Sequence, residues 1–251
     1  MNSVKLRSYE KLEEENKELK IVLRKLSHEM GNALTVLGAN IYYLEGDIKE
    51  GTKKFSIRDL KGDYTYICNL FKNLREYNHT EALDKRMYTV TELLDELENT
   101  FQRLNGSSEV KLEVHKHVDT DDTKIYADKH KIKQVLINIL KNSIEAMKQK
   151  ESSNSKYHSM EIVVRVNIEK GQSEYLHMEI RDNGIGISEK NIGSIFEPMF
   201  THGKEDGTGL GLSVVKKIME DHKGKIKAVS IQGKGTAMHI YFPLLNFFGS
   251  K

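Results

Sequence analysis

Apolar positions in the first part of the chain recur in alternating steps of three and four. The series is Leu12, Asn16, Leu19, Leu23, Leu26, Met30, Ala33 and Leu37. This heptad spacing predicts a helix that packs along one seam, and a polar residue such as Asn16 at an a position is typical of a contact that fixes register. From Ala33 the apolar face widens to include Leu34 and Ile41. That width favours a four-helix bundle over a two-stranded coil.

A second helix is predicted after a turn. Gly46 and Gly51 interrupt the first pattern, and Ser56 is a candidate helix cap. The next stripe consists of Ile57, Leu60, Tyr64, Ile67, Phe71 and Leu74. Two amphipathic helices joined by a turn form a helical hairpin, and one hairpin cannot cover both stripes. We therefore expect a homodimer whose two hairpins form a four-helix bundle, in a domain of residues 1–88.

The pattern then changes to short β-rich runs that alternate with helical ones. Strands are predicted at Val110–Val114, Lys124–Ala127, Glu161–Glu169, Tyr175–Asp182, Lys225–Ile231 and Thr236–Phe242. Helices are predicted at Thr91–Leu104, Asp128–Lys148 and Gly209–Asp221. Strands joined mainly as hairpins, with helices between them, indicate an α+β two-layer sandwich. Residues 89–251 are long enough to form an independent domain.

Composition narrows the class of protein. Charged residues make up 30% and hydrophobic residues 38%, the balance of a globular chain, and the net charge of +2 gives no reason to expect a nucleic-acid partner. No stretch reaches the ~20 apolar residues of a membrane-spanning helix, and the N-terminus has no signal-peptide core. The single cysteine, Cys68, fits a reducing compartment, and its apolar surroundings favour a buried thiol. We expect a cytoplasmic location.

A candidate nucleophile lies on the first helix. With Leu26 at a d position, His28 occupies an f position and faces solvent. Glu29 follows directly, and Asn32 lies one turn further along, close to the same face. A neutral imidazole, with a reference pKa of ~6.5, can attack phosphorus while a neighbouring carboxylate accepts the other ring proton. An exposed histidine on its own would not indicate a function, but the neighbouring Glu29 and Asn32 favour a reactive histidine at position 28.

A polar stripe follows the helix predicted at Asp128–Lys148. Asn138 and Asn142 are spaced i, i+4, and Glu145 continues the stripe. Carboxamides on a half-buried helix can be structural, but two of them beside a glutamate suggest a polar pocket. An asparagine oxygen can complete a magnesium shell that is shared with phosphates.

Two glycine-rich segments complete the candidate chemistry. Asp182 ends a predicted strand and precedes Asn183–Gly186; this could be an ordinary turn, but its two glycines allow a ligand to approach the backbone. The second segment, Gly207–Leu212, opens a helix, where free amide donors suit phosphate. It follows Phe196–Lys204, whose lysine can reach phosphate charge.

These segments, in this order, resemble the motifs of sensor histidine kinases, and the resemblance covers residues 12–244. The H-box corresponds to Ser27–Leu34, where Gly31 and Ala33 replace the usual Arg and Pro. The resemblance implies a dimerisation and histidine-phosphotransfer hairpin, followed by an ATP-binding domain of the Bergerat (GHKL) type. It implies ATP-dependent autophosphorylation on His28 and transfer to an aspartate of a response regulator's receiver domain, with regulator phosphatase activity left open.

The resemblance also assigns roles to residues. His28, Glu29 and Asn32 become the catalytic group, Asn142 the Mg²⁺ ligand and Asp182 the reader of adenine. The nucleotide-binding residues that it implies are Asn138, Asn142, Glu145, Asp182, Gly184, Gly186, Phe196, Lys204, Gly207, Thr208, Gly209, Leu210, Gly211, Leu212 and Thr236.

Two other classes of protein stay open. A serine kinase or ATPase of the same nucleotide fold explains the glycine segments, but not the hairpin or the cluster at His28. ATPases with this fold also carry a water-activating glutamate where this chain has Asn138. A non-enzymatic dimerisation module, or a phosphatase with an idle nucleotide domain, is the third class. The sequence names neither the input signal nor the regulator, and it leaves open a separate sensor or inhibitor protein and the choice between cis and trans phosphorylation.

Overall fold

The computed structural model describes residues 20, 23, 27, 30–42, 62, 64, 67, 68, 83–106, 109–153, 159–171, 173–201 and 209–244. The chain divides into two compact units. One comprises residues 1–79 with 197–210, and the other comprises residues 80–196 with 211–251.

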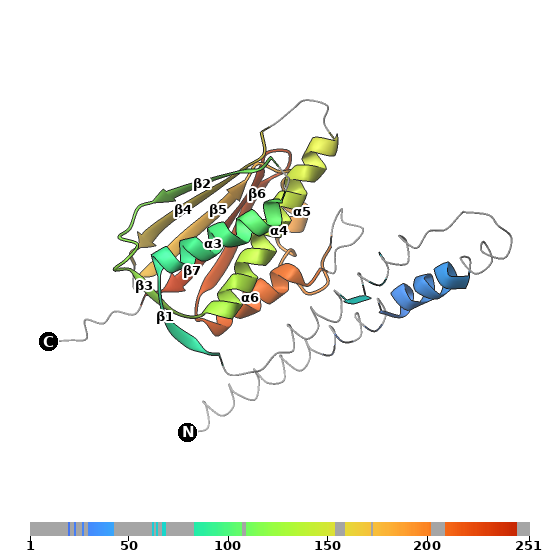
Figure 1. Cartoon of the computed structure of the whole chain (residues 1–251), viewed down its shortest axis with the longest axis horizontal. Coiled ribbons are helices and arrows are strands. Elements are labelled where there is room, and N and C mark those ends of the chain that lie inside the picture. The colour runs from blue at the N-terminus through green and yellow to red at the C-terminus, as the bar shows by residue number, and fades with distance from the viewer. Residues whose placement is uncertain are drawn as a thin grey trace, which may run out of the picture. The chain divides into compact units, whose positions relative to one another are not determined.

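The second unit is built on a five-stranded sheet (Figure 1). In chain order its strands are β2 (Lys111–Lys116), β4 (Glu161–Glu169), β5 (Tyr175–Asp182), β6 (Lys225–Ile231) and β7 (Gly235–Pro243). Their spatial order is β2-β4-β5-β7-β6, so β2 and β6 form the two edges. The pair β2–β4 is parallel, and the other three pairs are antiparallel.

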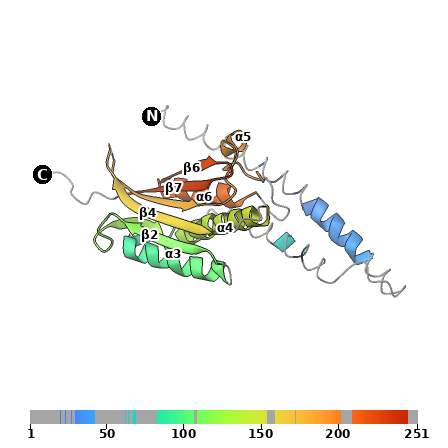
Figure 2. The same ribbon diagram turned by 90° about the horizontal axis from the view of Figure 1, so that it is seen from above.

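Three helices cover one face of this sheet: α3 (Val90–Asn105), α4 (Lys129–Ser153) and α6 (Gly211–Asp221) (Figures 1 and 2). The alternation of β4, β5 and β7 turns their buried apolar positions toward these helices, because successive strand side chains point to opposite faces. The fully buried side chains of the central strands and of α4 include Ile162, Val164, Val166, Leu176, Met178, Ile180, Ile132, Val135 and Leu140. The core therefore lies between the sheet and the helices, and none of these three helices covers the other face of the sheet.

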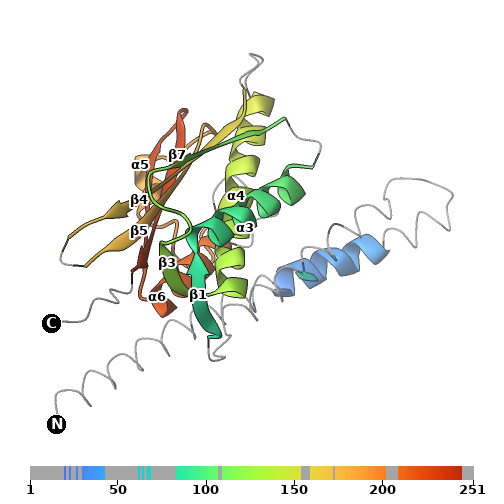
Figure 3. The same cartoon turned by 60° about the vertical axis from the view of Figure 1, so that its left-hand side comes forward.

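A smaller sheet pairs β1 (Lys85–Thr89) with β3 (Lys124–Asp128) (Figure 3). Both strands lead directly into helices, and each junction is capped. Thr89 Oγ1 accepts a hydrogen bond from the Glu92 amide at 3.1 Å, while the Glu92 carboxylate accepts one from the Thr89 amide at 2.8 Å. Asp128 accepts hydrogen bonds from the first amides of α4, those of His130 and Lys131. These caps fix where α3 and α4 begin.

The predicted α+β sandwich is confirmed. The predicted bounds of β4, β5 and β6 agree with the structure, and those of β2, β3, β7 and the three long helices differ by a few residues. Two elements were not predicted from the sequence: β1, whose partner strand lies 35 or more residues away, and the one-turn helix α5 (Glu189–Ile192). The proposed boundary between residues 88 and 89 stays a prediction.

Little of the first unit is described. Residues 30–42 are helical, and Ala33 and Ile67 are buried. Leu34 is 53% exposed and Tyr42 is 74% exposed in the single chain. Cys68 is exposed, so the prediction of a buried thiol is wrong for the isolated chain. The dimeric four-helix bundle stays a prediction. None of the described helices combines the length and the apolar composition of a membrane-spanning segment.

A buried histidine joins α6 to the start of α4. His222 is 3% exposed; its Nε2 accepts the Asp128 amide at 3.0 Å, and its Nδ1 lies 2.7 Å from the Ile218 carbonyl oxygen. Only the neutral ring with its proton on Nδ1 satisfies both contacts. Burial lowers the pKa of His222, although the hydrogen bond to Ile218 opposes that shift.

The stability of the fold should therefore fall in acid. The folded pKa of His222 lies below the unfolded value of ~6.5, so its contribution is complete above that pH and is lost as pH falls toward the folded pKa. The slope from this one group is at most about 1.4 kcal/mol per pH unit. His222→Gln keeps an acceptor for the Asp128 amide but does not titrate, so urea unfolding at pH 7.5 and pH 5 should show a smaller loss than in wild type. The exposed His117→Gln is the control; an undiminished loss in His222→Gln would rule out this role.

Candidate functional site

Asp182 is the centre of the candidate site. It ends β5, is 6% exposed and points to the helix side of the sheet. Its Oδ1 accepts hydrogen bonds from the amides of Gly184 at 2.9 Å and Thr236 at 3.3 Å. Its Oδ2 accepts one from Ser143 Oγ on α4 at 3.1 Å. A carboxylate that is nearly enclosed by donors is held in a single orientation.

Opposing effects act on the charge of this carboxylate. Burial raises the pKa of Asp182, because the charged form loses its hydration. Hydrogen bonds from Gly184, Ser143 and Thr236, together with the charge of Lys150, act in the other direction without cancelling the effect of burial. Such a buried carboxylate gains from any additional donor that a ligand brings to Oδ2.

The turn after Asp182 packs tightly on α4. A Cβ atom at Gly184 would lie 2.8 Å from the Ala146 Cβ, closer than real side chains pack. Gly186 has a φ of 68°, and a Cβ atom there would collide with the Ile231 carbonyl oxygen. The Ile185 amide donates to the Ala146 carbonyl oxygen at 3.2 Å. Glycine is required at these two positions by a close approach and by a left-handed backbone.

Asn183 fixes the same turn from outside. Its Oδ1 accepts the Glu161 amide at 3.1 Å, and its Nδ2 donates to the Ser159 carbonyl oxygen at 2.7 Å. Lys150 donates to the Asn183 carbonyl oxygen at 2.7 Å. Asn183 therefore acts as a structural residue that holds the turn against α4 and β4.

The β6–β7 hairpin forms another wall. Ser230 Oγ accepts the Ile187 amide at 2.8 Å and donates to the Gly235 carbonyl oxygen at 2.9 Å. It also lies 2.9 Å from Thr236 Oγ1. Because the Thr236 amide donates to Asp182, the hairpin, the turn and the carboxylate form one connected hydrogen-bond network.

Helix α4 runs along the whole candidate site. Ser143 contacts Asp182 and Ala146 contacts Gly184, whereas Asn138 lies one and a half turns earlier. The Asn138 Nδ2 donates to the Gln134 carbonyl oxygen at 3.1 Å, and its Oδ1 would lie 3.0 Å from a Cβ atom at Gly211. Gly211 is the first residue of α6, so Asn138 faces the amide end of that helix. The rise of a helix separates Asn138 from Ser143 by about 7.5 Å.

The arrangement places two kinds of ligand-binding groups at opposite ends of one wall. A buried acceptor, Asp182, lies at one end, and a helix N-terminus with a carboxamide lies at the other. Asn142 and Glu145 are half-buried on the same helix. Asn142 lies between Asn138 and Ser143 in the chain, and Glu145 follows Ser143. Glu145 also forms an ion pair with Lys141 at 3.7 Å. A molecule with an amino group at one end and phosphates at the other fits this pattern.

The other predicted residues are placed less completely. Phe196 is half-buried, Leu212 lies in the first turn of α6, and Asn32 is exposed on the helix of residues 30–42. Gly209, with a φ of 65°, and Leu210 belong to the compact unit that also contains residues 1–79. His28, Glu29, Lys204, Gly207 and Thr208 lie outside the described residues.

Two residues were not predicted from the sequence: Ser143, which contacts Asp182, and Ser230, which contacts the turn after it. A signal for Ser143 was present, because it occupies a buried position of α4 between Leu140 and Met147. A buried hydroxyl needs a hydrogen-bond partner. That partner is 39 residues away, a separation that periodicity along the chain does not reveal.

Comparisons with known proteins agree with this geometry. Residues 127–246 match the family model described as histidine kinase-, DNA gyrase B- and HSP90-like ATPase. Sporulation kinase E of Bacillus subtilis is 30% identical over 220 residues, which cover 87% of this chain and 28% of that protein. Sporulation kinase A of the same organism is 34% identical over 227 residues, covering 87% of this chain and 33% of that protein. The chain thus spans about a third or less of these relatives.

A solved structure of the catalytic domain of histidine kinase ThkA also resembles the chain. It is 28% identical, with a TM-score of 0.51, and the match covers 64% of this chain and 98% of the other. The α+β unit described above is therefore similar to a histidine kinase catalytic domain in both sequence and fold.

Proposed function

The chain belongs to the sensor histidine kinases, and from this membership we propose that it binds Mg-ATP, phosphorylates itself on His28 and passes the phosphoryl group to an aspartate of a response regulator. The observation that carries the proposal is the wall formed by α4. It places buried Asp182 at one end and Asn138, facing the N-terminus of α6, at the other. This spacing suits a nucleotide whose base and phosphates must be held at the same time.

At the base end, we assign Asp182 to the exocyclic amino group of adenine. Its Oδ1 is already occupied by two backbone amides, whereas Oδ2 accepts only the Ser143 hydroxyl among the described residues. Oδ2 therefore has acceptor capacity left for an amino group, and a hydrogen bond to a carboxylate is stronger than one between neutral groups. Gly184 and Gly186 let the base approach the backbone, and Thr236 holds the carboxylate from the other side.

At the phosphate end, the charge is met by backbone amides and by magnesium. The described residues contain no group of three or more His, Cys, Asp or Glu side chains that could hold a metal ion. Mg²⁺ usually takes few protein ligands and keeps phosphate oxygens and waters, so Asn142 suffices as its side-chain ligand, with Glu145 nearby. Bound Mg²⁺ would supply positive charge to the phosphate oxygens. The neutral Asn138 does not activate water, which favours transfer to a side chain over hydrolysis.

Lys204 and the segment Gly207–Gly211 are assigned to the phosphates and to a lid over them. Amides that begin α6 point along its dipole, which favours the negative charge of the transferred group. Phe196 lies just before this segment, and Leu212 just after it. Phosphoryl transfer depends mainly on positioning and electrostatics, so closure of such a lid would complete the site.

The acceptor is His28 on the first helix. A ring nitrogen attacks the terminal phosphorus, a P–N bond forms, and the bond from phosphorus to the bridging oxygen of ADP breaks. Glu29 accepts the proton of the other ring nitrogen, and Asn32, which is exposed, orients the incoming group. The same two side chains are candidates to assist hydrolysis of the regulator's phosphoaspartate.

Dimerisation completes the proposed molecule. Leu34, Val36 and Ile41 are exposed on the described helix of the single chain, and a second copy would cover them in a four-helix bundle. The domains are assigned as residues 1–88 and 89–251. The hinge between them is assigned near residues 79–88, a range that includes the first four residues of β1. The proposed location is cytoplasmic.

Phosphotransfer profiling tests the second half of the proposal. The chain, labelled with γ-³²P-ATP and freed of nucleotide, is mixed with each purified receiver domain of the source genome. Label should move within the first minutes to one or a few receivers, and a receiver whose phosphoacceptor aspartate is replaced by asparagine is the control. A solved complex of the histidine kinase ThkA with the response regulator protein TrrA motivates this experiment. Release of free phosphate alone, with no receiver labelled, would favour an ATPase instead.

A further inference from the structure

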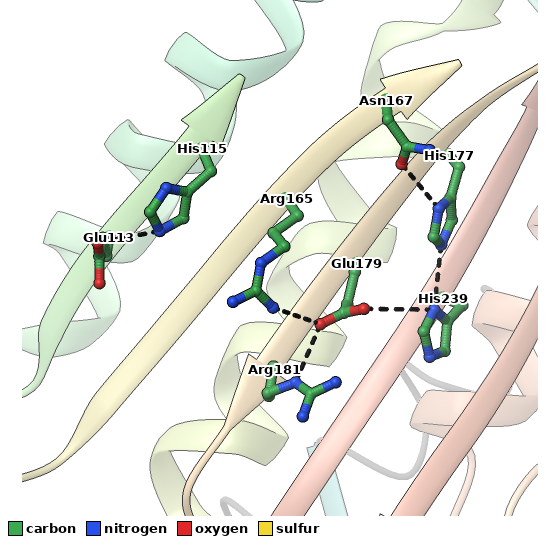
Figure 4. Close-up of polar contacts among 8 residues, drawn as sticks. All are labelled: Glu113, His115, Arg165, Asn167, His177, Glu179, Arg181 and His239. Atoms are coloured by element: carbon green, nitrogen blue, oxygen red, sulfur yellow. Dashed lines mark hydrogen bonds and ion pairs between the residues drawn. The ribbon is translucent and has the colours of Figure 1, made fainter. Parts of the chain in front are cut away.

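The sheet has a second face, opposite the helices and Asp182. On this face, polar and aromatic side chains of neighbouring strands lie side by side. Tyr241 lies beside Lys225 and His177, and His239 lies beside Lys227 and Glu179. Figure 4 shows part of this face, with Arg165 and Arg181 converging on Glu179. The ligand-binding wall of α4 is on the other side of the sheet, so any site on this face is separate from it.

Charges in the middle of this face are already compensated, but those at the β6 edge are not. Glu179 forms ion pairs with Arg165 at 3.0 Å and Arg181 at 2.9 Å. In contrast, neither Lys225 nor Lys227 forms an ion pair with a carboxylate within the described part of the chain, and both are exposed. An anion that approaches this face would therefore find uncompensated positive charge at that edge.

A hollow lies at this edge, between β6 and the turn that joins β4 to β5. It has a volume of about 360 Å³. Its lining consists of Glu169, Lys170, Gly171, Ser173, Tyr175, Lys225, Lys227 and Tyr241. Three lysines and one glutamate give this lining a net charge of +2, which matches a dianion. The volume falls at the lower end of the range for small-molecule sites, about 300–1,000 Å³.

Two tyrosine rings give the hollow aromatic walls. Tyr175 and Tyr241 stand perpendicular, with their ring centres 6.4 Å apart. Lys225 Nζ lies 4.7 Å from the Tyr175 ring centre, and Lys227 Nζ lies 5.9 Å from that of Tyr241. Tyr241 is also stacked on His177 at 4.6 Å, so its ring is held in place. Burial raises the pKa of Tyr241, so its hydroxyl stays a neutral donor beside an anion.

We propose that this hollow on the open face of the sheet, bounded by Lys170, Lys225, Lys227, Tyr175 and Tyr241, binds a small phosphomonoester that carries a planar ring. A phosphomonoester has a charge of about −1.5 to −2 at neutral pH, which complements the net charge of the lining. The three ammonium groups and the Tyr241 hydroxyl meet the phosphate, and the tyrosine rings meet the planar group. The site binds its ligand independently of the nucleotide that the proposed kinase activity requires.

Edge protection is the competing explanation for two of these lysines. Lysine side chains on an edge strand such as β6 prevent it from pairing with another chain, and they need no ligand for that role. Edge protection alone does not require the tyrosines, the third lysine on the β4–β5 turn, or a hollow between them. The two explanations differ in a measurable property, because only the proposed site saturates with a small anion.

Calorimetry on the whole chain with phenyl phosphate as the probe tests the proposal. Saturating ADP is present throughout, so that the nucleotide site is filled. Phenyl phosphate should bind in a saturable manner. It should bind more tightly than inorganic phosphate, which lacks the ring, and more tightly than benzyl alcohol, which lacks the phosphate. In protein with ring-labelled tyrosine, the NMR signals of Tyr175 and Tyr241 should shift along the same binding curve.

A pair of matched variants locates the site. Lys225→Gln combined with Lys227→Gln should raise the dissociation constant about tenfold, because two exposed lysine–phosphate pairs are lost. Lys111→Gln combined with Lys124→Gln removes the same charge from exposed positions outside the hollow and should leave it within about twofold. Thermal unfolding and ADP affinity should be unchanged in both variants. Lack of saturable binding in the presence of ADP, or wild-type affinity in the first variant, would overturn the proposal.

Discussion

Asp182→Asn should lower the affinity of the chain for ADP about 100-fold, equivalent to about 2.7 kcal/mol. In the proposed complex, Oδ2 of Asp182 accepts the adenine amino group. Asparagine would put an NH₂ group there, so that two donors face each other and a charge-assisted hydrogen bond is lost. The affinity is measured by calorimetry with the wild-type and variant chains, with and without magnesium.

The same substitution should leave the fold intact, which makes the test specific. The asparagine Oδ1 can still accept the amides of Gly184 and Thr236, and its Nδ2 can donate to the Ser143 hydroxyl, which rotates to accept. The free energy of unfolding should therefore change by no more than about 1 kcal/mol. Asp122→Asn, at an exposed position, is the control for the change of charge. Unchanged ADP affinity in a folded Asp182→Asn would remove Asp182 from the base site.

His28→Gln should abolish incorporation of label from γ-³²P-ATP. Glutamine keeps a polar side chain at the position but provides no nucleophilic ring nitrogen, so no P–N bond can form. Because the proposed nucleotide site lies in residues 89–251, ADP affinity should stay within about twofold of wild type. A substitution at a distant, independent position is expected to change the affinity by no more than that. Labelled protein is quantified after removal of nucleotide under alkaline conditions.

A matched variant shows whether the loss is specific to His28. His130→Gln makes the same exchange at an exposed histidine of α4 and should keep wild-type labelling. Mixed dimers test the proposed dimerisation. A chain with His28→Gln but an intact nucleotide site, combined with an Asp182→Asn chain, should recover labelling if phosphorylation occurs in trans. Persistent labelling of His28→Gln alone would place the acceptor elsewhere.

Much of the fold could be predicted because it is encoded locally. Alternation within β4, β5 and β6 is regular, and a turn follows each strand, so their bounds agree with the structure. The missed strand β1 shows the limit of this method. KRMYT is five residues long, and it becomes a strand because Met87 and Thr89 pair with Tyr126 and Lys124. A contact between segments so far apart leaves no periodic pattern in the five residues of β1.

The candidate site was predicted in parts, but not in its connections. Asp182, Gly184 and Gly186 were found because a carboxylate and glycines after a strand have a recognisable pattern. The contact of Ser143 with Asp182, and that of Asn138 with the start of α6, depend on how α4 packs against the sheet. The hollow at the β6 edge was not predicted, because Lys225 and Lys227 look like ordinary exposed residues of a strand until Tyr175 and Tyr241 are placed beside them.

The central claim is that a nitrogen of the His28 ring carries the phosphoryl group, and the chemical stability of that bond tests it most directly. A P–N bond is hydrolysed in acid and survives alkali, whereas a serine phosphoester survives acid. The wild-type chain is labelled with γ-³²P-ATP, divided, and held at pH 2 or pH 12 before the protein-bound label is counted. We predict that the label is lost at pH 2, retained at pH 12, and located on a peptide that contains His28. Label that survives at pH 2 would contradict the account.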